Sequence, residues 1–253
     1  MLAPELILSL AKDPDRRIGI GAAADLTKVR ASVTRANAAR YGSSAIYRDP
    51  GEMVRDLKRG ELDAVVRGSL DSNSVMGAVR REFSVEGVQR MALLQPRKGP
   101  MFFLAPVGVD EGWTAEQRFE LAKNGARLMR RLGEEPRIGF LSGGRRGDKG
   151  RHPAVDRTLE ETAALVQRCL AIGIEAVDHE ILIEEAARDC NMIIAPDGVS
   201  GNLVFRTLHF LGEGRALGAP IINIDRVFVD TSRAKGSYLD SIALASALVG
   251  VRQ

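Results

Sequence analysis

Polar, glycine-rich segments follow four hydrophobic runs of this 253-residue chain, and they hold the residues best suited to chemistry. Their glycines let backbone N–H groups approach an anion, and their arginines and lysines neutralise its charge. Their serines and aspartates can hold or move a proton. One such segment is ordinary, but four favour a shared site for an anionic small molecule. They read VVRGSLDSNS (65–74), FLSGGRRGDKGRH (140–152), APDGVSGN (195–202) and VFVDTSRAKGS (227–237).

The last of these segments carries the residues with the clearest catalytic potential. Ser232 and Arg233 stand just before a helix predicted to begin near Ser237, where they can hold a phosphate or an oxyanion. Asp230 is close enough in sequence to act as a general base. An N-cap and a salt bridge explain the same residues equally well, so both interpretations stay open.

The other three segments supply candidate ligands for the same anion. Composition alone also fits a solvated basic loop after residue 140 and a plain turn after residue 195. The basic segment lacks the G-x-x-x-x-G-K-[ST] spacing of a nucleotide-binding P-loop. The predicted binding residues are Arg67, Gly68, Ser142, Gly143, Gly144, Arg145, Asp197, Ser200, Gly201 and Asn202.

The elements that must position these residues are short apolar strands alternating with amphipathic helices. Continuous apolar runs indicate strands covered on both faces, and the strand–helix alternation predicts an α/β fold with mainly parallel sheet. Ligands of such sheets bind at the carboxyl ends of the strands. We expect strands at 17–23, 44–47, 62–69, 91–95, 101–107, 137–144, 191–197, 220–224 and 227–230.

The turn-rich link PRKGP (96–100) interrupts this alternation and predicts a hairpin between its two flanking strands. We expect the chain to pass from one lobe to another in this region and to return at its C-terminal end. The predicted division is a first α/β lobe of residues 1–103 plus 225–253 and a second of 104–224. The helix predicted over 114–133 begins with Thr114 as N-cap and ends at Gly133.

Composition excludes several classes of function. The net charge of +3 and the aromatic content of 5% are too low for a typical nucleic-acid surface. No stretch reaches the length of about 18 apolar residues that a membrane span needs. The two cysteines and three histidines show no metal-ligand spacing, so we expect no metal site and a cytoplasmic location.

Taken in order, these segments resemble motifs of the phosphate acetyltransferase and butyryltransferase (phosphotransacylase) family over most of the chain. The similar motifs are LDAVVRGS, RIGFLSGG, APDGVSGN, GAPIINI and VDTSRA. Further phrases, FFLAPVGVDEGWT, GRHPAVDRTL and VFVDTSRA, resemble a methanogen group of methyltransferase X subunits, known as methanogenesis marker proteins, within that family.

The resemblance implies two α/β lobes of the phosphotransacylase and isocitrate dehydrogenase type with a cleft between them, and a homodimer. It implies coenzyme A or another thiol- or phosphate-bearing coenzyme as a possible cofactor. Ser232 and Arg233 match the family's Ser-Arg pair and Asp230 the Asp before it. Asp240 reaches the position of the family's basic Asp only with a one-residue insertion.

Departures from the family pattern suggest the same cleft with a different ligand. Arg67 replaces a Ser, and SGGRRG replaces the family's Ser-x-Lys-Gly portion. Three hypotheses therefore remain: a methyltransferase subunit acting on an anionic cofactor or substrate, with a possible partner subunit; a phosphate acyltransferase using acyl-CoA and phosphate; and a non-catalytic cofactor-binding or regulatory relative.

Overall fold

The computed structural model describes residues 2–251, which form two compact units. The outer unit contains residues 3–88 and 217–251, and the middle unit contains Leu2 and residues 89–216. Each unit consists of strands and helices. The outer unit combines the N-terminal and C-terminal parts of the chain. The division into lobes of residues 1–103 plus 225–253 and 104–224 stays a prediction.

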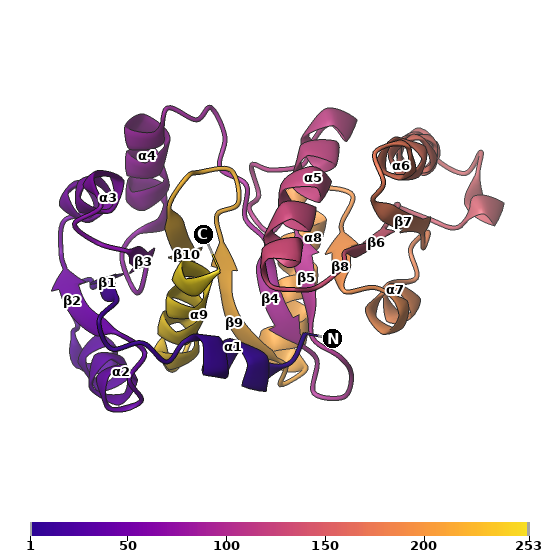
Figure 1. The fold of residues 1–253 in the computed structure, drawn as a ribbon. Coiled ribbons are helices and arrows are strands. Elements are labelled where there is room, and N and C mark those ends of the chain that lie inside the picture. The colour runs from indigo at the N-terminus through magenta and orange to yellow at the C-terminus, as the bar shows by residue number, and fades with distance from the viewer. Residues whose placement is uncertain (1, 252–253) are drawn as a thin grey trace. The chain divides into compact units, whose positions relative to one another are not determined.

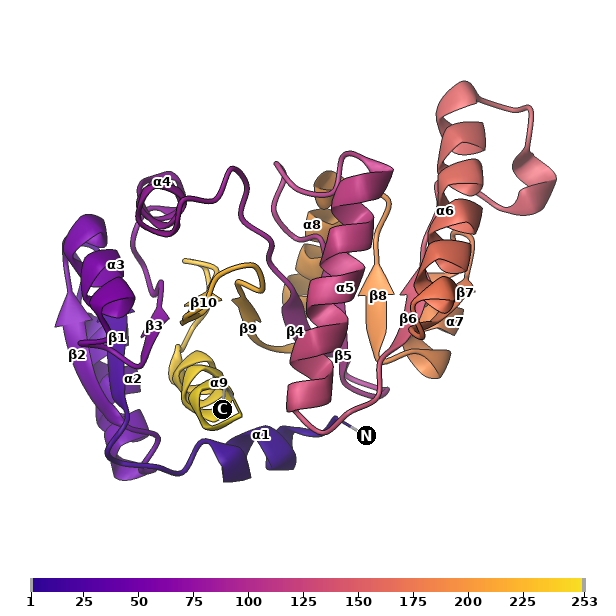
Figure 2. The same cartoon turned by 45° about the horizontal axis from the view of Figure 1, so that its top comes forward.

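The sheet of the outer unit has the strand order β2-β1-β3-β10-β9. The first four strands are mutually parallel, and β9 pairs with β10 in the antiparallel direction. Helices α3 and α4 pack together on one face, and α2 and α9 lie on the other (Figures 1 and 2). The strands are β1 (Arg17–Gly21), β2 (Ser43–Tyr47), β3 (Ala64–Val66), β9 (Arg215–Pro220) and β10 (Val227–Asp230); the helices are α1 (Pro4–Leu10), α2 (Thr27–Ala38), α3 (Pro50–Arg59), α4 (Ser72–Phe83) and α9 (Leu239–Gly250).

The sheet of the middle unit has the order β4-β5-β8-β6-β7, and all its strands except β4 run parallel. Helices α5 and α6 pack side by side on one face, and α7 and α8 contact the strands from the other (Figure 2). The strands are β4 (Ala92–Gln95), β5 (Phe102–Ala105), β6 (Arg137–Phe140), β7 (Glu175–Asp178) and β8 (Met192–Ile194); the helices are α5 (Ala115–Arg131), α6 (Pro153–Ala171), α7 (Ile183–Asp189), α8 (Gly198–Arg206), a short 3-10 turn at Arg146–Asp148 and a π-helical turn at Thr207–Leu211.

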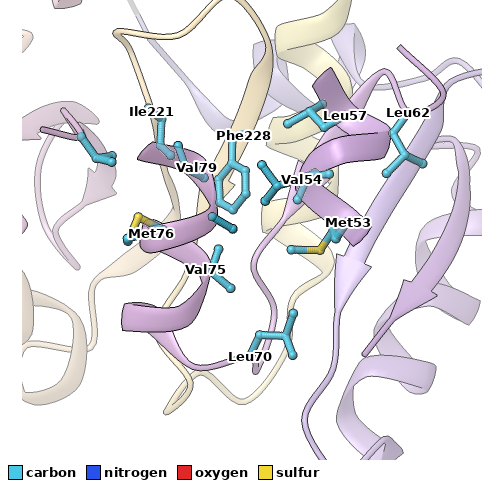
Figure 3. Close-up of a cluster of buried hydrophobic side chains, with 13 residues drawn as sticks. Met53, Val54, Leu57, Leu62, Leu70, Val75, Met76, Val79, Ile221 and Phe228 are labelled. Carbon is cyan, nitrogen blue, oxygen red and sulfur yellow. The ribbon is translucent and has the colours of Figure 1, made fainter. Parts of the chain in front are cut away.

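A dense apolar cluster fixes α3 and α4 against the outer sheet. Phe228 of β10 lies at its centre, between Val54 of α3 and Val75 and Val79 of α4 (Figure 3). All four side chains are fully buried. Burial of a large aromatic ring here holds the end of β10, and hence the residues that follow it, in a defined position.

The α/β fold with mainly parallel sheet is confirmed, and so is the hairpin, which is the antiparallel pair β4–β5. The strand predicted over 220–224 is wrong. β9 ends at Pro220, Ile221 still donates its N–H to the Phe228 carbonyl at 2.9 Å, and residues 222–226 turn back to β10. The apolar Ile221 and Ile224 pack on the cluster around Phe228. The sequence analysis also missed β7, since this edge strand is half exposed and lacks a continuous apolar run.

The N-terminal end of α5 carries the cap expected from the sequence. The Thr114 hydroxyl accepts a hydrogen bond from the Gln117 N–H at 3.1 Å, and the Gln117 side chain accepts one from the Thr114 N–H at 3.3 Å. Together these bonds form a capping box, which satisfies two of the donors that a helix start leaves unpaired.

We expect Thr114→Ala to lower the free energy of unfolding by about 1 kcal/mol, because the alanine cannot accept the Gln117 N–H bond. Thr114→Ser keeps the hydroxyl and should retain most of the stability. Urea unfolding followed by circular dichroism measures both variants. Equal losses in the two variants would show that the methyl group, and not the cap, matters.

Candidate functional site

Parallel pairing brings the ends of three outer-unit strands to one edge of the sheet. Val66 of β3 lies opposite Val229 of β10 and also opposite Ile20 of β1. Because Val66 and Val229 are paired, the residues that follow β3 lie beside those that follow β10. Two of the polar segments predicted to form a site, after Val66 and after Val229, are therefore neighbours in space.

Arg67 and Asp230 form a buried ion pair at this edge, with Arg67 Nε donating to Asp230 Oδ1. The remaining nitrogens of Arg67 donate to backbone carbonyls of Leu70, at 2.8 Å, and Thr231. Asp230 Oδ1 also accepts the N–H of Thr231 at 2.7 Å. Every nitrogen of the guanidinium therefore has a partner within the protein, which favours a positioning role for Arg67.

Gly68 is required where the chain turns out of β3. Its φ of +62° lies in the left-handed region, and a Cβ there would overlap the carbonyl oxygen of Gly21. The Thr231 hydroxyl donates to the Gly68 carbonyl at 2.9 Å. The exits of β1, β3 and β10 are thus joined by direct backbone contacts.

Ser232 and Arg233 lie beyond the buried pair and are accessible. Ser232 is half-buried, and the Arg233 side chain is 62% exposed, with Asp71 at the start of α4 3.9 Å away. Lys28 of α2 donates to the carbonyls of Arg233 and Lys235 at 2.8 and 2.7 Å. The loop is therefore fixed through its backbone, while the Arg233 guanidinium faces solvent. Asp240 is half-buried in the first turn of α9.

In the middle unit, the segment after β6 is folded on itself. Ser142 is buried and donates to the Gly144 carbonyl at 2.9 Å, and the Gly143 N–H donates to Thr158 Oγ1 at 2.8 Å. Arg145 is exposed and makes no salt bridge within 4 Å among the described residues. Of the residues predicted here, Arg145 is the one with an accessible charged group.

Most other cations of this loop are neutralised by neighbouring carboxylates. Arg146 lies 3.4 Å from Asp178 and 3.6 Å from Glu180, and Arg151 forms an ion pair with Asp148 at 2.5 Å. These pairs are exposed on the arginine side, so each stabilises the loop only weakly. The interpretation of the segment as a solvated basic loop thus accounts for these two arginines.

The segment after β8 is the tightly packed start of α8. Asp197 caps the helix by accepting the Ser200 N–H at 2.8 Å and the Ser200 hydroxyl at 3.0 Å. A Cβ at Gly198 or at Gly201 would overlap a backbone carbonyl of the loop after β5. Asn202 Nδ2 donates to the Val107 carbonyl at 2.7 Å. These glycines are needed for close backbone approach, whether or not a ligand binds.

The predicted site residues therefore fall into two groups, each at the carboxyl edge of its own sheet. The single shared site stays a prediction. The outer-unit group contains Arg67, Gly68, Asp230, Ser232, Arg233 and Asp240; the middle-unit group contains Ser142, Gly143, Gly144, Arg145, Asp197, Ser200, Gly201 and Asn202.

Two residues with functional potential were missed. Lys28 organises the loop at Arg233, and Arg118 of α5 is a buried cation paired with Glu161 of α6. Nothing in their local sequence marks them, because both lie within ordinary amphipathic helices. The charge pattern of such helices does not distinguish a buried arginine from an exposed one.

The histidines and cysteines make one buried contact. Cys190 Sγ lies 3.3 Å from His179 Nε2. Burial raises the pKa of the Cys190 thiol to about 11, so it is protonated at neutral pH. Among residues 2–251, no three His, Cys, Asp or Glu side chains gather as metal ligands would, and no helix has the length and apolar composition to cross a bilayer.

We expect Gly201→Ala to destabilise the fold by about 1–3 kcal/mol, because the added methyl group must displace the Pro106 carbonyl. Gly147→Ala is the matched control, since a Cβ at Gly147 meets no atom within 4 Å. Urea unfolding of both variants provides the comparison. Equal stability of the two variants would contradict the close approach of α8.

We expect Arg67→Met to lower the free energy of unfolding by about 3–5 kcal/mol at pH 7, because Asp230 is left buried without its partner. The double variant Arg67→Met/Asp230→Asn should recover part of this loss. A double-mutant cycle measured by urea unfolding gives the coupling. Additive effects of the two changes would rule out a coupled pair.

Several proteins are similar to this chain in sequence. The chain is 47% identical, over 79% of its length and 72% of the relative's, to the "Putative methyltransferase mtx subunit X" of Methanosarcina mazei. It is 37% identical to an "Uncharacterized methyltransferase" of Methanopyrus kandleri over 80% of the chain and 82% of that protein. A phosphate acetyltransferase of Corynebacterium glutamicum is 23% identical over 84% of the chain and 71% of that protein. No family model matches the sequence.

Solved structures show the same fold at low sequence identity. A branched-chain phosphotransacylase from Enterococcus faecalis superimposes with a TM-score of 0.73 at 16% identity, covering 92% of this chain and 99% of that one. A phosphotransacetylase from Streptococcus pyogenes gives 0.72 at 18% identity, covering 100% and 99%. The fold is phosphotransacylase-like, and the chain belongs to the family of the Methanosarcina mtx subunit X proteins.

Proposed function

We propose that this chain is a group-transfer protein that binds an anionic small molecule at the carboxyl edge of the outer-unit sheet. The observation that carries the proposal is the placement of Ser232 and Arg233. Their loop is held by Lys28 through two backbone carbonyls, while the Arg233 guanidinium remains 62% exposed. A fixed loop that presents an exposed cation and a hydroxyl suits an anion such as a phosphate or carboxylate.

Of the two candidate bases, we assign the proton transfer to Asp240. Asp230 is buried against Arg67 and also accepts the Thr231 N–H, so its carboxylate is already engaged within the protein. Asp240 is half-buried in the first turn of α9, a few residues beyond Ser232. In our proposal Asp230 positions Arg67 and the loop, and Asp240 takes the proton.

The proposed step is a displacement at the carbon that is transferred. Asp240 accepts the proton of the attacking nucleophile, whose electron pair forms the new bond to that carbon. The bond from carbon to the leaving group breaks at the same centre, and the leaving group departs with that electron pair. Arg233 balances the negative charge of the leaving group, and the Ser232 hydroxyl donates a hydrogen bond to it.

The residues at this edge fit a thiol- or phosphate-bearing coenzyme such as coenzyme A. Such a coenzyme supplies a thiol nucleophile or an acyl or alkyl donor. Arg233 would hold one of its phosphates. Separately, the exposed Arg145 is a candidate for binding an anionic group at the edge of the middle-unit sheet. The binding roles predicted for the other middle-unit residues stay proposals for the edge of the middle-unit sheet alone.

The names of the relatives guide the choice of reaction. Several are called methyltransferases or methyltransferase subunits. Methyl transfer, with a partner subunit and a homodimeric chain, is therefore the form of the proposal that we favour.

Two other functions remain alternatives. A phosphate acyltransferase using acyl-CoA and phosphate fits the fold of the solved neighbours. A non-catalytic cofactor-binding or regulatory relative fits the internal pairing of Arg67 and Asp230, which leaves fewer free groups at the site.

We expect the double variant Ser232→Ala/Arg233→Gln to weaken coenzyme A or coenzyme M binding by about tenfold or more, because it removes a charge-assisted hydrogen bond. Arg59→Gln is the control, because this exposed arginine is in the last turn of α3, away from the strand exits. Isothermal titration calorimetry measures all three proteins. Unchanged affinity in the double variant would end the proposal.

Activity and binding assays of the wild type and of Asp240→Asn distinguish the alternatives. Methyl or acyl transfer by the wild-type chain that is lost in Asp240→Asn, with coenzyme binding retained, supports the catalytic forms. Binding without turnover of acyl phosphates or methyl donors supports the regulatory relative.

A further inference from the structure

Arg118 is a buried arginine whose hydrogen-bonding capacity is only partly used. It lies in the first turn of α5, and its side chain is 1% exposed. Its Nη2 donates to Glu161 of α6. Its Nε and Nη1 are buried and have no hydrogen-bond partner among the described residues. Three N–H groups of a cation, one on Nε and two on Nη1, therefore lack an acceptor.

This arrangement is costly unless something else supplies oxygen atoms. Burial lowers the pKa of the Arg118 guanidinium, and Glu161 opposes that effect. Buried polar groups in folded proteins nearly always have partners, and a charged donor left alone loses more free energy than a normal hydrogen bond contributes. The missing acceptor is therefore a group that joins the protein from outside or an internal water.

Topology brings three helix starts to one edge of the middle-unit sheet, and those of α5 and α8 lie nearest to Arg118. Strands β5, β8 and β6 are adjacent and parallel, so α5, α8 and α6, which follow them, all begin at the same edge of the sheet (Figure 2). The Gly198 N–H of α8 donates to the Glu111 carbonyl before α5 at 2.9 Å, which ties two of these starts together. The positive ends of the α5 and α8 dipoles are thus held close together, whereas Arg118 meets α6 at Glu161, about two turns beyond the start of that helix.

The fixed charges near Arg118 are two carboxylates and two guanidinium groups, which balance one another. Asp197, at the start of α8, and Arg157, on α6, are both close enough to act on its guanidinium electrostatically. The two arginines balance Asp197 and Glu161, and the helix ends add positive potential. An occupant must bring several acceptor oxygens for the three N–H groups, which a tetrahedral phosphoryl group does.

We propose that Arg118, with the N-terminal ends of α5 and α8, forms a binding site for a phosphoryl group, either free phosphate or the phosphate of a nucleotide coenzyme. This site is independent of the one proposed at Ser232 and Arg233. Because Nε and Nη1 have almost no exposed surface, neighbouring side chains must change rotamer when the group binds.

Thermal unfolding of the full chain tests the site with inorganic phosphate, sulfate, coenzyme A and chloride at equal ionic strength. We expect phosphate or coenzyme A to raise the melting temperature of the wild type by mass action. Arg118→Met should weaken the apparent affinity by about tenfold or more. Arg127→Gln, an exposed position on the same helix, should respond like the wild type.

Glu161→Gln is a second variant, which keeps Arg118 and removes the competing carboxylate, so it should bind phosphate more tightly than the wild type. A response to coenzyme A but not to phosphate identifies the coenzyme as the source of the group, and the reverse identifies free phosphate. Equal responses of the wild type and Arg118→Met, or none in the wild type, would overturn the site and assign the missing acceptor to internal water.

The two proposals fail separately. Loss of coenzyme binding in Ser232→Ala/Arg233→Gln with a phosphate response still sensitive to Arg118→Met supports the Arg118 site alone. Retained coenzyme binding in that double variant, together with loss in Arg118→Met, supports the Arg118 site and removes the proposal for the outer unit.

Discussion

Parallel pairing of strands is the constraint on which both candidate sites depend. In each unit, neighbouring parallel strands end at one edge, and the helices that follow them begin there. Backbone donors and helix dipoles are therefore concentrated at that edge before any particular side chain is considered. This concentration explains why residues distant in sequence, such as Arg67 and Asp230, become direct neighbours.

The buried pair of Arg67 and Asp230 shows how charge is used structurally in the outer unit. Taking both groups out of water is unfavourable, and mutual attraction together with the backbone hydrogen bonds offsets that cost. The pair connects the ends of β3 and β10 and so fixes the loop that carries Ser232 and Arg233. A residue that looks like a ligand-binding arginine in the sequence is thus occupied within the protein.

Arg118 presents the opposite case in the middle unit. Its single carboxylate partner leaves donors unsatisfied in a buried position, at an edge where three helices begin. An arginine fully occupied by the protein is explained by the fold, whereas one with unused donors calls for an additional acceptor. The two arginines differ in how many of their guanidinium nitrogens have a hydrogen-bond partner within the protein.

The sequence by itself determined the α/β class, most strand positions and the polar segments after the strands. Apolar runs and helical periodicity are local patterns, and the capped start of α5 at Thr114 depends on residues close in the chain. The edge strand β7 was not predicted, because it is half exposed. Ile221 and Ile224 suggested a strand over 220–224, although the chain turns there toward β10 and both side chains pack on the cluster around Phe228.

Only the tertiary structure decided which charges are used and which are free. Ion pairs such as Arg67 with Asp230 and Arg118 with Glu161 join residues 163 and 43 positions apart, so no local pattern reveals them. Burial, which makes an unpaired donor costly, likewise arises only when helices pack on sheets. The residue types indicate which chemistry is possible, and the tertiary packing determines which partner each charged group has.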